Sequence, residues 1–249
     1  MTRQRFPARR APAALPALLL ALCTLVALAG CMSLDSPGSG GPVVEAPVFR
    51  VGDRWVYRAQ DGFRSPVRWE ETREVVAIGA DGIRVRVVQK GPTVDNSRME
   101  TWPAPGLVLV GAVFDNETRR FATPMKRFDY PLLPGKAWNQ HIANFNEQTG
   151  KEGVFNRYVR VSGWTTVTTP AGMFDAIEMR VQARLDDEEF WRWPTESNYL
   201  VAYAPAVRGM VREEKEAQYL EKGSANDGVS VLRSQHAVLE LLSFTPGAP

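Results

Sequence analysis

The chain has 249 residues, of which 44% are hydrophobic and 23% charged, and its formal net charge is +2. The basic excess lies in the first 30 residues, which hold four arginines and no acidic residue, so residues 31–249 carry a net charge of −2. This near-neutral balance, without runs of lysine and arginine, excludes the electrostatic footprint of a nucleic-acid-binding protein.

The N-terminus has the layout of a secretory signal peptide. A basic region at the start contains Arg3, Arg5, Arg9 and Arg10. A leucine- and alanine-rich stretch follows at 13–29 and ends in Leu28-Ala29-Gly30-Cys31, with no basic flank behind it. Small residues at the end of an apolar stretch are typical of a signal-peptidase site rather than of a membrane-spanning helix.

These four residues resemble the lipobox of bacterial lipoproteins. The resemblance implies cleavage between Gly30 and Cys31 and attachment of acyl chains such as palmitate to Cys31, which would anchor the mature protein in a membrane. Met32, rather than an aspartate, follows the cysteine. By resemblance to the sorting pattern of Gram-negative cells, this implies the periplasmic face of the outer membrane. An ordinary secretory signal or an uncleaved anchor helix is the alternative.

Residues 31–47 are predicted to form a flexible tether, because glycine, serine and proline dominate and large apolar residues are few. Cys23 lies in the predicted signal peptide, so Cys31 is the single cysteine of the mature chain. Disulfides and cysteine–metal sites are therefore excluded from the mature protein.

Residues 48–249 are predicted to be an antiparallel β domain. Apolar and polar residues alternate over 83–87 and 175–183, as in half-buried strands. Gly79–Gly82 and Pro170–Gly172 predict hairpin turns. Strands are predicted at 55–59, 67–78, 83–89, 99–102, 107–114, 157–169, 174–183, 190–193, 199–203, 210–214 and 229–244, and residues 212–222 also fit a helix. Short turns without intervening helices predict an all-β fold: a curled sheet, a sandwich or a partial barrel.

A weak internal similarity concerns the architecture. Gly52 and Gly135 each precede a tryptophan by three residues, at Trp55 and Trp138, and each pair follows an apolar segment and a predicted turn. The β domain therefore consists of two related meanders, or the similarity is a coincidence.

Tryptophan is a conspicuous component of the predicted strands, with residues at 55, 69, 102, 138, 164, 191 and 193. Core packing explains most of them. Trp191 and Trp193 would share one face of the strand predicted at 190–193, with Arg192 on the other face. These two tryptophans are candidate ligand contacts.

Three segments resemble recurring parts of uncharacterised β-domain proteins of the bacterial envelope: Phe128–Trp138, Thr168–Ile177 and Tyr203–Val211. They contain a proline–leucine turn, a Pro-Ala-Gly-x-Phe-Asp-Ala hairpin and a Tyr-x-Pro-x-Val-x-Gly strand end. Met173 and Arg208 depart from the usual pattern. The resemblance implies an all-β fold and no functional residue.

Catalytic and metal-binding patterns are missing from the sequence, so we predict no cofactor, metal or catalytic residue. The two histidines, His141 and His236, lie 95 residues apart. The acidic run 186–189 is predicted to be an exposed loop, with a carboxylate pair for glycoside hydrolysis as the alternative.

These patterns favour a membrane-anchored, non-catalytic envelope lipoprotein that binds or assembles with a partner. The expected partner is an envelope protein or an apolar or glycan ligand. A hydrolase acting on envelope glycan or lipid is the alternative function.

Overall fold

The computed structural model describes residues 41–114, 117–187, 189–223 and 231–248. The predicted signal peptide, the lipobox with Gly30 and Cys31, and the first part of the predicted tether lie outside the described residues. In the described part of the chain, no helix is both long and apolar enough to cross a membrane.

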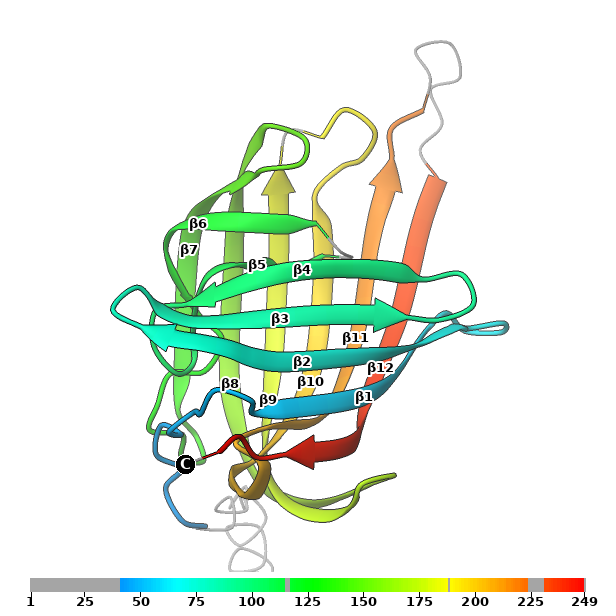
Figure 1. Cartoon of the computed structure of the whole chain (residues 1–249). Helices are drawn as coiled ribbons and strands as arrows, with labels where there is room; N and C mark the ends of the chain where they lie inside the picture. Colours follow the sequence, from blue (N-terminus) through cyan, green and yellow to red (C-terminus); the bar gives the residue numbers. More distant parts are fainter. Residues whose placement is uncertain (1–40, 115–116, 188, 224–230, 249) are drawn as a thin grey trace, which may run out of the picture. The chain divides into compact units, whose positions relative to one another are not determined.

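Within the described residues, twelve antiparallel strands follow one another around a closed barrel (Figure 1). Their bounds are β1 Arg54–Asp61, β2 Val67–Gly79, β3 Gly82–Lys90, β4 Asp95–Trp102, β5 Leu107–Ala112, β6 Thr118–Lys126, β7 Ala137–Asn146, β8 Lys151–Thr169, β9 Gly172–Asp187, β10 Thr195–Ala204, β11 Gly209–Glu221 and β12 Val231–Thr245. A short 3₁₀ turn, η2 (Pro205–Val207), connects β10 to β11. β1 pairs with β12 from Arg54↔Thr245 to Asp61↔Ala237, and this pairing closes the barrel.

The all-β prediction is confirmed, and the sheet closes completely where a partial barrel was one of three expectations. Both predicted hairpin turns are present, since Gly79 pairs with Gly82 and Thr169 with Gly172. Residues 212–222, which also fit a helix, belong largely to strand β11.

Two strands were not predicted and one predicted strand is wrong. β6 and β7 lie in segments to which no strand was assigned. Residues 190–193 form a turn instead of a strand, with a single isolated bridge from Arg192 to Glu221. Arg192 is fully buried there, whereas Phe190 and Trp193 are exposed.

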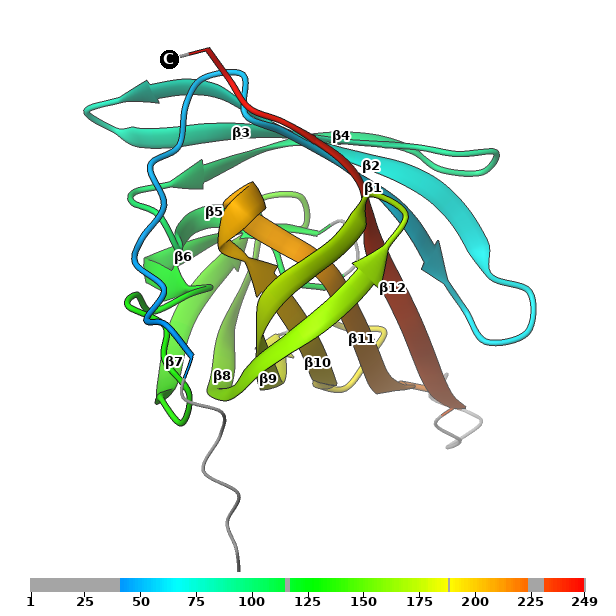
Figure 2. The same cartoon turned by 90° about the horizontal axis from the view of Figure 1, so that it is seen from below.

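The barrel has two differently oriented walls. In Figure 1, β1–β4 run across the page in front, whereas β8–β12 run up the page behind them. Figure 2 shows that the β8/β9 hairpin and η2 lie across the lower end of the barrel.

Aromatic side chains fill this lower end. Phe49, which precedes β1, lies 5.8 Å from Trp55 and 5.7 Å from Trp102, measured between ring centroids. Trp55 also stacks on Phe244, and the Trp55 Nε1 donates a 2.7 Å hydrogen bond to the carbonyl oxygen of Val207 in η2. The barrel is therefore closed at this end by packed rings.

Candidate functional site

A cavity of about 760 Å³ occupies the interior of the barrel. It reaches the end opposite the aromatic cluster, because Asp61, Val94, Glu117 and Gln148 line it beside the β1/β2, β3/β4, β5/β6 and β7/β8 connections. We call this cavity the lumen. The lumen is closed at the aromatic end and reaches the opposite rim of the barrel, so it is cup-shaped.

The two walls give the lumen two kinds of lining. Strands β2–β4 contribute mainly polar and charged side chains, namely Glu71, Arg73, Gln89, Asp95, Asn96, Arg98 and Glu100. The opposite wall contributes most of the apolar ones, namely Met125, Phe155, Val201, Met210, Ala237 and Leu239. The lumen is therefore amphiphilic.

Strand periodicity explains how charges come to lie inside. Side chains two residues apart share one face of a strand. In β2, Glu71 and Arg73 line the lumen four and two residues before the fully buried Val75, and in β8 Arg157 lies between Phe155 and Val159 on the inward face. The inward faces thus mix charged and apolar residues.

Glu71 is the centre of one buried polar group. Its carboxylate accepts hydrogen bonds from Arg73 Nε (2.7 Å) and from Gln89 Nε2 (2.6 Å). Burial on its own would raise the pKa of Glu71, but Arg73, Arg98 and the Gln89 hydrogen bond together hold that pKa below its ordinary value. The Glu71 carboxylate is therefore ionised and hydrogen-bonded to Arg73 and Gln89.

Glu100, on β4, is the centre of a second group, and β3 lies between this strand and β2. It accepts hydrogen bonds from Trp102 Nε1 (3.0 Å), Arg98 Nε (3.2 Å) and Arg127 Nη2 (3.2 Å). Burial opposes ionisation, yet Arg127, Arg98 and Arg73 outweigh it and lower the pKa of Glu100 to about 2. Neither Glu71 nor Glu100 is suited to donate a proton near neutral pH.

A third group on the opposite wall has a different charge pattern. Arg157 is 6% exposed, and its guanidinium donates to the carbonyl oxygens of Lys126 (2.6 Å) and Arg127 (3.3 Å). Burial lowers the pKa of Arg157 to about 10. On β11, Lys215 Nζ donates a 3.4 Å hydrogen bond to the Val113 carbonyl oxygen, which also accepts one from the Tyr199 hydroxyl. These bonds go to neutral carbonyl groups.

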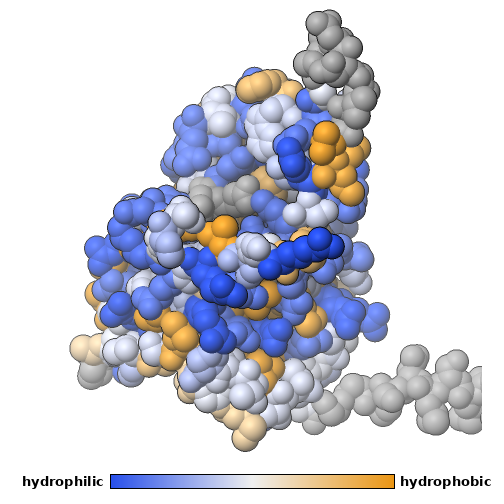
Figure 3. All heavy atoms as spheres, turned by 90° about the vertical axis from the view of Figure 1, so that its right-hand side faces the viewer, coloured by the Kyte–Doolittle hydropathy of each residue, from blue (hydrophilic) through white to orange (hydrophobic). Residues whose placement is uncertain are grey.

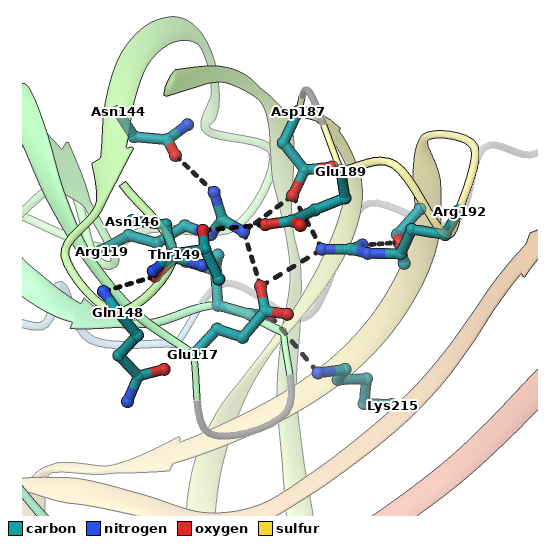
Figure 4. Close-up of polar contacts among 12 residues, drawn as sticks. Glu117, Arg119, Asn144, Asn146, Gln148, Thr149, Asp187, Glu189, Arg192 and Lys215 are labelled. Atoms are coloured by element: carbon teal, nitrogen blue, oxygen red, sulfur yellow. Dashed lines mark hydrogen bonds and ion pairs between the residues drawn. The ribbon is translucent and has the colours of Figure 1, made fainter. Parts of the chain in front are cut away.

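A rim network lies above the lumen, where the β5/β6 and β9/β10 connections meet (Figure 4). Asp187 Oδ2 accepts one hydrogen bond from Arg119 and one from Arg192, both of 2.7 Å. Glu117 Oε2 accepts a 2.5 Å bond from the first arginine and a 3.2 Å bond from the second. Arg119 also donates to Asn144 Oδ1 at 3.0 Å. Burial raises the pKa of Asp187, and both arginines oppose that rise.

This network corrects the prediction that residues 186–189 form an exposed loop. The side chains of Asp187 and Glu189 are buried, and Glu189 accepts a 3.0 Å hydrogen bond from the Thr149 hydroxyl. Asp186 is exposed, with 53% of its side chain accessible. The acidic run is thus partly interior, because it ends β9 at a buried ion cluster.

The two candidate tryptophans lie outside the lining of the lumen. Trp191 packs edge-on against Tyr219 at 5.4 Å and against the guanidinium of Arg192 at 4.9 Å. Trp193 is 51% exposed, with Lys222 Nζ 5.2 Å from its ring centroid. Trp191 is therefore packed among other side chains, whereas Trp193 is half exposed.

The histidines are also kept apart. His141 contacts Asn156 on the outside of β7, and His236 Nε2 lies 3.0 Å from Glu214 Oε1. In the described ranges, no group of three or more histidine, cysteine, aspartate or glutamate residues is placed to hold a metal ion.

The lumen residues were not identified from the sequence. Period-two alternation assigns charged residues to the outer face by default, and in this barrel several of them lie inside. A usable signal exists in β2, since Glu71 and Arg73 occupy the same alternate positions as the buried Val75. A charge in register with core valines indicates a polar interior.

In the part of the chain that the structure describes, the fold and site are those of a closed, twelve-stranded antiparallel barrel with an amphiphilic lumen. No protein-family model matches the chain, and no curated protein matches it at a significant level. A protein from Bacteroides fragilis, described as a "putative exported protein with YmcC-like fold", superposes with a TM-score of 0.51 and 13% identity, covering 81% of this chain and 99% of its own. A "putative lipoprotein" from Parabacteroides distasonis gives a TM-score of 0.49 and 13% identity, covering 82% of this chain and 100% of its own. The first similarity shows a shared fold.

Proposed function

We propose that this protein is a lipid-anchored protein of the bacterial envelope whose barrel binds a small amphiphilic molecule in its lumen. The observation that carries the proposal is the cavity of about 760 Å³, closed at one end by aromatic rings and lined on two walls by different chemistry. Pockets for small molecules have volumes of about 300–1,000 Å³.

One face of the outer surface supports the same location for the ligand. Figure 3 shows hydrophilic side chains over most of the face that it presents, with apolar side chains in small groups between them. A protein that docks through an apolar surface would expose a larger contiguous patch. The apolar wall of the lumen is more continuous than the small apolar groups on this outer face.

The envelope address rests on the sequence. Residues 1–30 are the proposed signal peptide, and Cys31 is the proposed acylated residue, at the periplasmic face of the outer membrane. The description of the Bacteroides fragilis protein as exported agrees with this address. Two or three acyl chains would give durable anchoring, at about 0.8 kcal/mol for each buried CH₂ group.

Binding has more support than hydrolysis of envelope glycan or lipid. The buried carboxylates of the lumen, Glu71 and Glu100, are held by arginines and have lowered pKa values. A glycoside hydrolase needs one carboxylic acid with a raised pKa beside a second carboxylate. The carboxylates Glu71 and Glu100 are therefore better suited to hold the charged lining of a binding site in place than to catalyse hydrolysis.

The binding proposal is tested with the uncharged fluorescent probe N-phenyl-1-naphthylamine and the detergent-purified protein, with empty micelles as blank. Ala237→Trp places an indole in the lumen from β12, and we expect it to abolish the saturable fluorescence increase of the wild type. Ser234→Trp adds the same ring at an exposed position of that strand and should leave binding intact. Absence of saturable binding to the wild type, or equal loss in both variants, would refute the lumen site.

The anchor is tested separately with Cys31→Ala. We expect the wild-type protein to yield an acylated N-terminal peptide that begins at Cys31, and the variant to keep its signal peptide, because the lipobox offers no other sulfur. Mass spectrometry of the N-terminal peptide distinguishes the two forms. A mature N-terminus at any other residue in the wild type would contradict the proposed anchor.

A further inference from the structure

Among the residues that the structure describes, two cations of the lumen have no carboxylate as an ion-pair partner. Arg157 bonds to the carbonyl oxygens of Lys126 and Arg127, and Lys215 bonds to that of Val113. The Lys215 ammonium also lies 5.5 Å from the ring centroid of Tyr199. Arg157, Tyr199 and Lys215 all line the lumen. We call Arg157 and Lys215 the basic pair.

The other charges of the lumen are largely matched. Arg73, Arg98 and Arg127 surround Glu71 and Glu100 with the hydrogen bonds described above. At the rim, Asp95 pairs with Lys90 at 2.5 Å, Asp61 accepts the backbone N–H of His236 at 3.0 Å, and Glu117 belongs to the rim network. Glu213 is the remaining acidic residue of the lining. The basic pair and these three arginines therefore face three interior carboxylates.

We infer that the ligand of the lumen carries an anionic group, a carboxylate or a phosphate, that is bound by Arg157 and Lys215. This inference rests on the proposed function and specifies its ligand. Guanidinium and ammonium groups form charge-assisted hydrogen bonds with both kinds of anion. The apolar residues of the same wall, such as Phe155 and Val201, would contact the rest of the molecule.

Burial of Arg157 makes it a stronger anion-binding group than a surface cation would be. Arg157 is withdrawn from water, and burial lowers its pKa to about 10, which reports an incompletely compensated charge. An anion in the lumen would supply that compensation in a medium where charges interact more strongly than in water. Glu213, whose charge acts on Arg157, opposes an incoming anion.

The test compares two probes that share an aromatic framework. 8-Anilinonaphthalene-1-sulfonate carries an anionic group, and N-phenyl-1-naphthylamine is uncharged. With the full-length gene expressed and the lipoprotein purified in detergent, we expect Arg157→Met and Lys215→Met each to raise the Kd of the anionic probe about tenfold, the effect of losing one charge-assisted contact. The Kd of the uncharged probe should stay unchanged.

Matched variants separate a local charge effect from a general one. Arg160→Met removes an exposed arginine from the same strand as Arg157 and should change neither Kd. Glu213→Gln removes the competing carboxylate and should tighten binding of the anionic probe alone. Lys215→Met decides the outcome if Arg157→Met fails to fold, because Lys215 is partly exposed and makes one long hydrogen bond.

The chemistry of the anion is distinguished by displacement of the bound sulfonate probe. Octyl phosphate and octanoate should displace it more strongly than octan-1-ol, and the stronger of the two identifies the preferred group. Equal displacement by octan-1-ol, or unchanged binding of the sulfonate probe to both Met variants, overturns the anion site while the lumen proposal stands. Binding of neither probe to the wild type overturns both.

Discussion

At the residue scale, the most consequential side chain of the rim is Asp187. One of its carboxylate oxygens accepts hydrogen bonds from two arginines, Arg119 and Arg192, which have no exposed side-chain surface. Among the described residues, Glu117 is the other carboxylate that pairs with both guanidinium groups. We therefore expect Asp187→Asn to lower the free energy of unfolding by about 3 kcal/mol, the scale for breaking a buried ion pair. Urea denaturation measures this difference.

Asp186→Asn is the matched control, because Asp186 is the preceding residue and its exposed side chain lies 3.5 Å from a half-exposed Arg184. We expect a change within about 0.5 kcal/mol, as for surface substitutions. Equal effects of the two variants would show that the rim network does not stabilise the barrel.

The lowered pKa of Glu100 predicts how the free energy of unfolding depends on pH. Its ordinary pKa of 4.5 is lowered to about 2 in the folded protein, so folding favours the ionised form. The associated stabilisation, about 3 kcal/mol, is fully present above pH 4.5 and is lost as the pH falls from about 4.5 toward about 2. Glu100→Gln should be less stable than the wild type at pH 6, and the difference should shrink by about that amount at pH 2.

The measurement is the free energy of unfolding of both proteins between pH 2 and pH 7. Glu196→Gln, at a side chain with 57% exposure, serves as the control and should follow the wild type throughout. A constant difference between Glu100→Gln and the wild type across this range would contradict the ionised, arginine-bound carboxylate.

At the scale of elements, the β2/β3 turn contains two glycines with different roles. Gly82 has φ = +102°, and a Cβ atom there would lie 2.5 Å from the Trp102 carbonyl oxygen, whereas a Cβ at Gly79 would meet nothing within 4 Å. We expect Gly82→Ala to cost about 2 kcal/mol through backbone strain and this contact. Gly79→Ala should change stability by less than about 0.5 kcal/mol. Thermal melts of both variants test the contrast.

Turns of this kind are why the hairpins could be predicted from the sequence. Glycine-rich turns between alternating segments identified β2–β3 and β8–β9, and their registers agree with the predicted turn residues. The sequence around β6 and β7 contains no comparable turn signal that would predict their pairing. β6 contains Pro124, and the described pairing between the two strands is limited to residues 119–121 opposite 144–146.

Where β6 and β7 diverge, hydrogen bonds from side chains link the two strands. Gln140 Oε1 accepts a 2.7 Å hydrogen bond from the backbone N–H of Lys126, and Trp138 Nε1 donates to the Lys126 carbonyl oxygen at 3.2 Å. Arg157 donates to the same carbonyl oxygen at 2.6 Å. Such pairings depend on three strands meeting, so a pattern within one segment cannot predict them.

The same reason applies to the turn at 190–193. Its aromatic residues favoured a strand, but Arg192 is buried by ion pairs with Glu117, from the β5/β6 connection, and with Asp187, the last residue of β9. A charged residue has no local signal that tells whether distant partners will bury it. Candidate site residues chosen by residue type, Trp191 and Trp193, were therefore placed away from the lumen.

At the scale of the whole barrel, closure explains how a charged interior is tolerated. Pairing of β1 with β12 leaves no free edge along this ladder, so backbone polar groups are satisfied by neighbouring strands. The aromatic cluster then provides an apolar floor, and several of the charged groups above it form ion pairs with one another. The barrel therefore has an apolar, aromatic lower end and a polar lumen above it.

The chain segment before β1 belongs to this lower end. Val44 is buried and exchanges backbone hydrogen bonds of 2.9 and 2.8 Å with Leu132, and Pro42 accepts a 3.1 Å bond from Trp164 Nε1. These contacts lie within 31–47, the range predicted as tether. Its last residues are therefore packed on the barrel.

Comparing a fragment of residues 41–249 with one of residues 48–249 tests this contribution, since both retain all twelve strands. Burial of one valine side chain contributes about 1.5–3 kcal/mol. The shorter fragment should therefore melt about 5 to 10 °C below the longer one. Val44→Ala in the longer fragment should produce part of that decrease, whereas Val43→Ala, at a 52% exposed neighbour, should produce almost none. Identical melting temperatures of the two fragments would mean that residues 41–47 do not stabilise the closed end, and that the barrel begins at Phe49 as a self-sufficient unit.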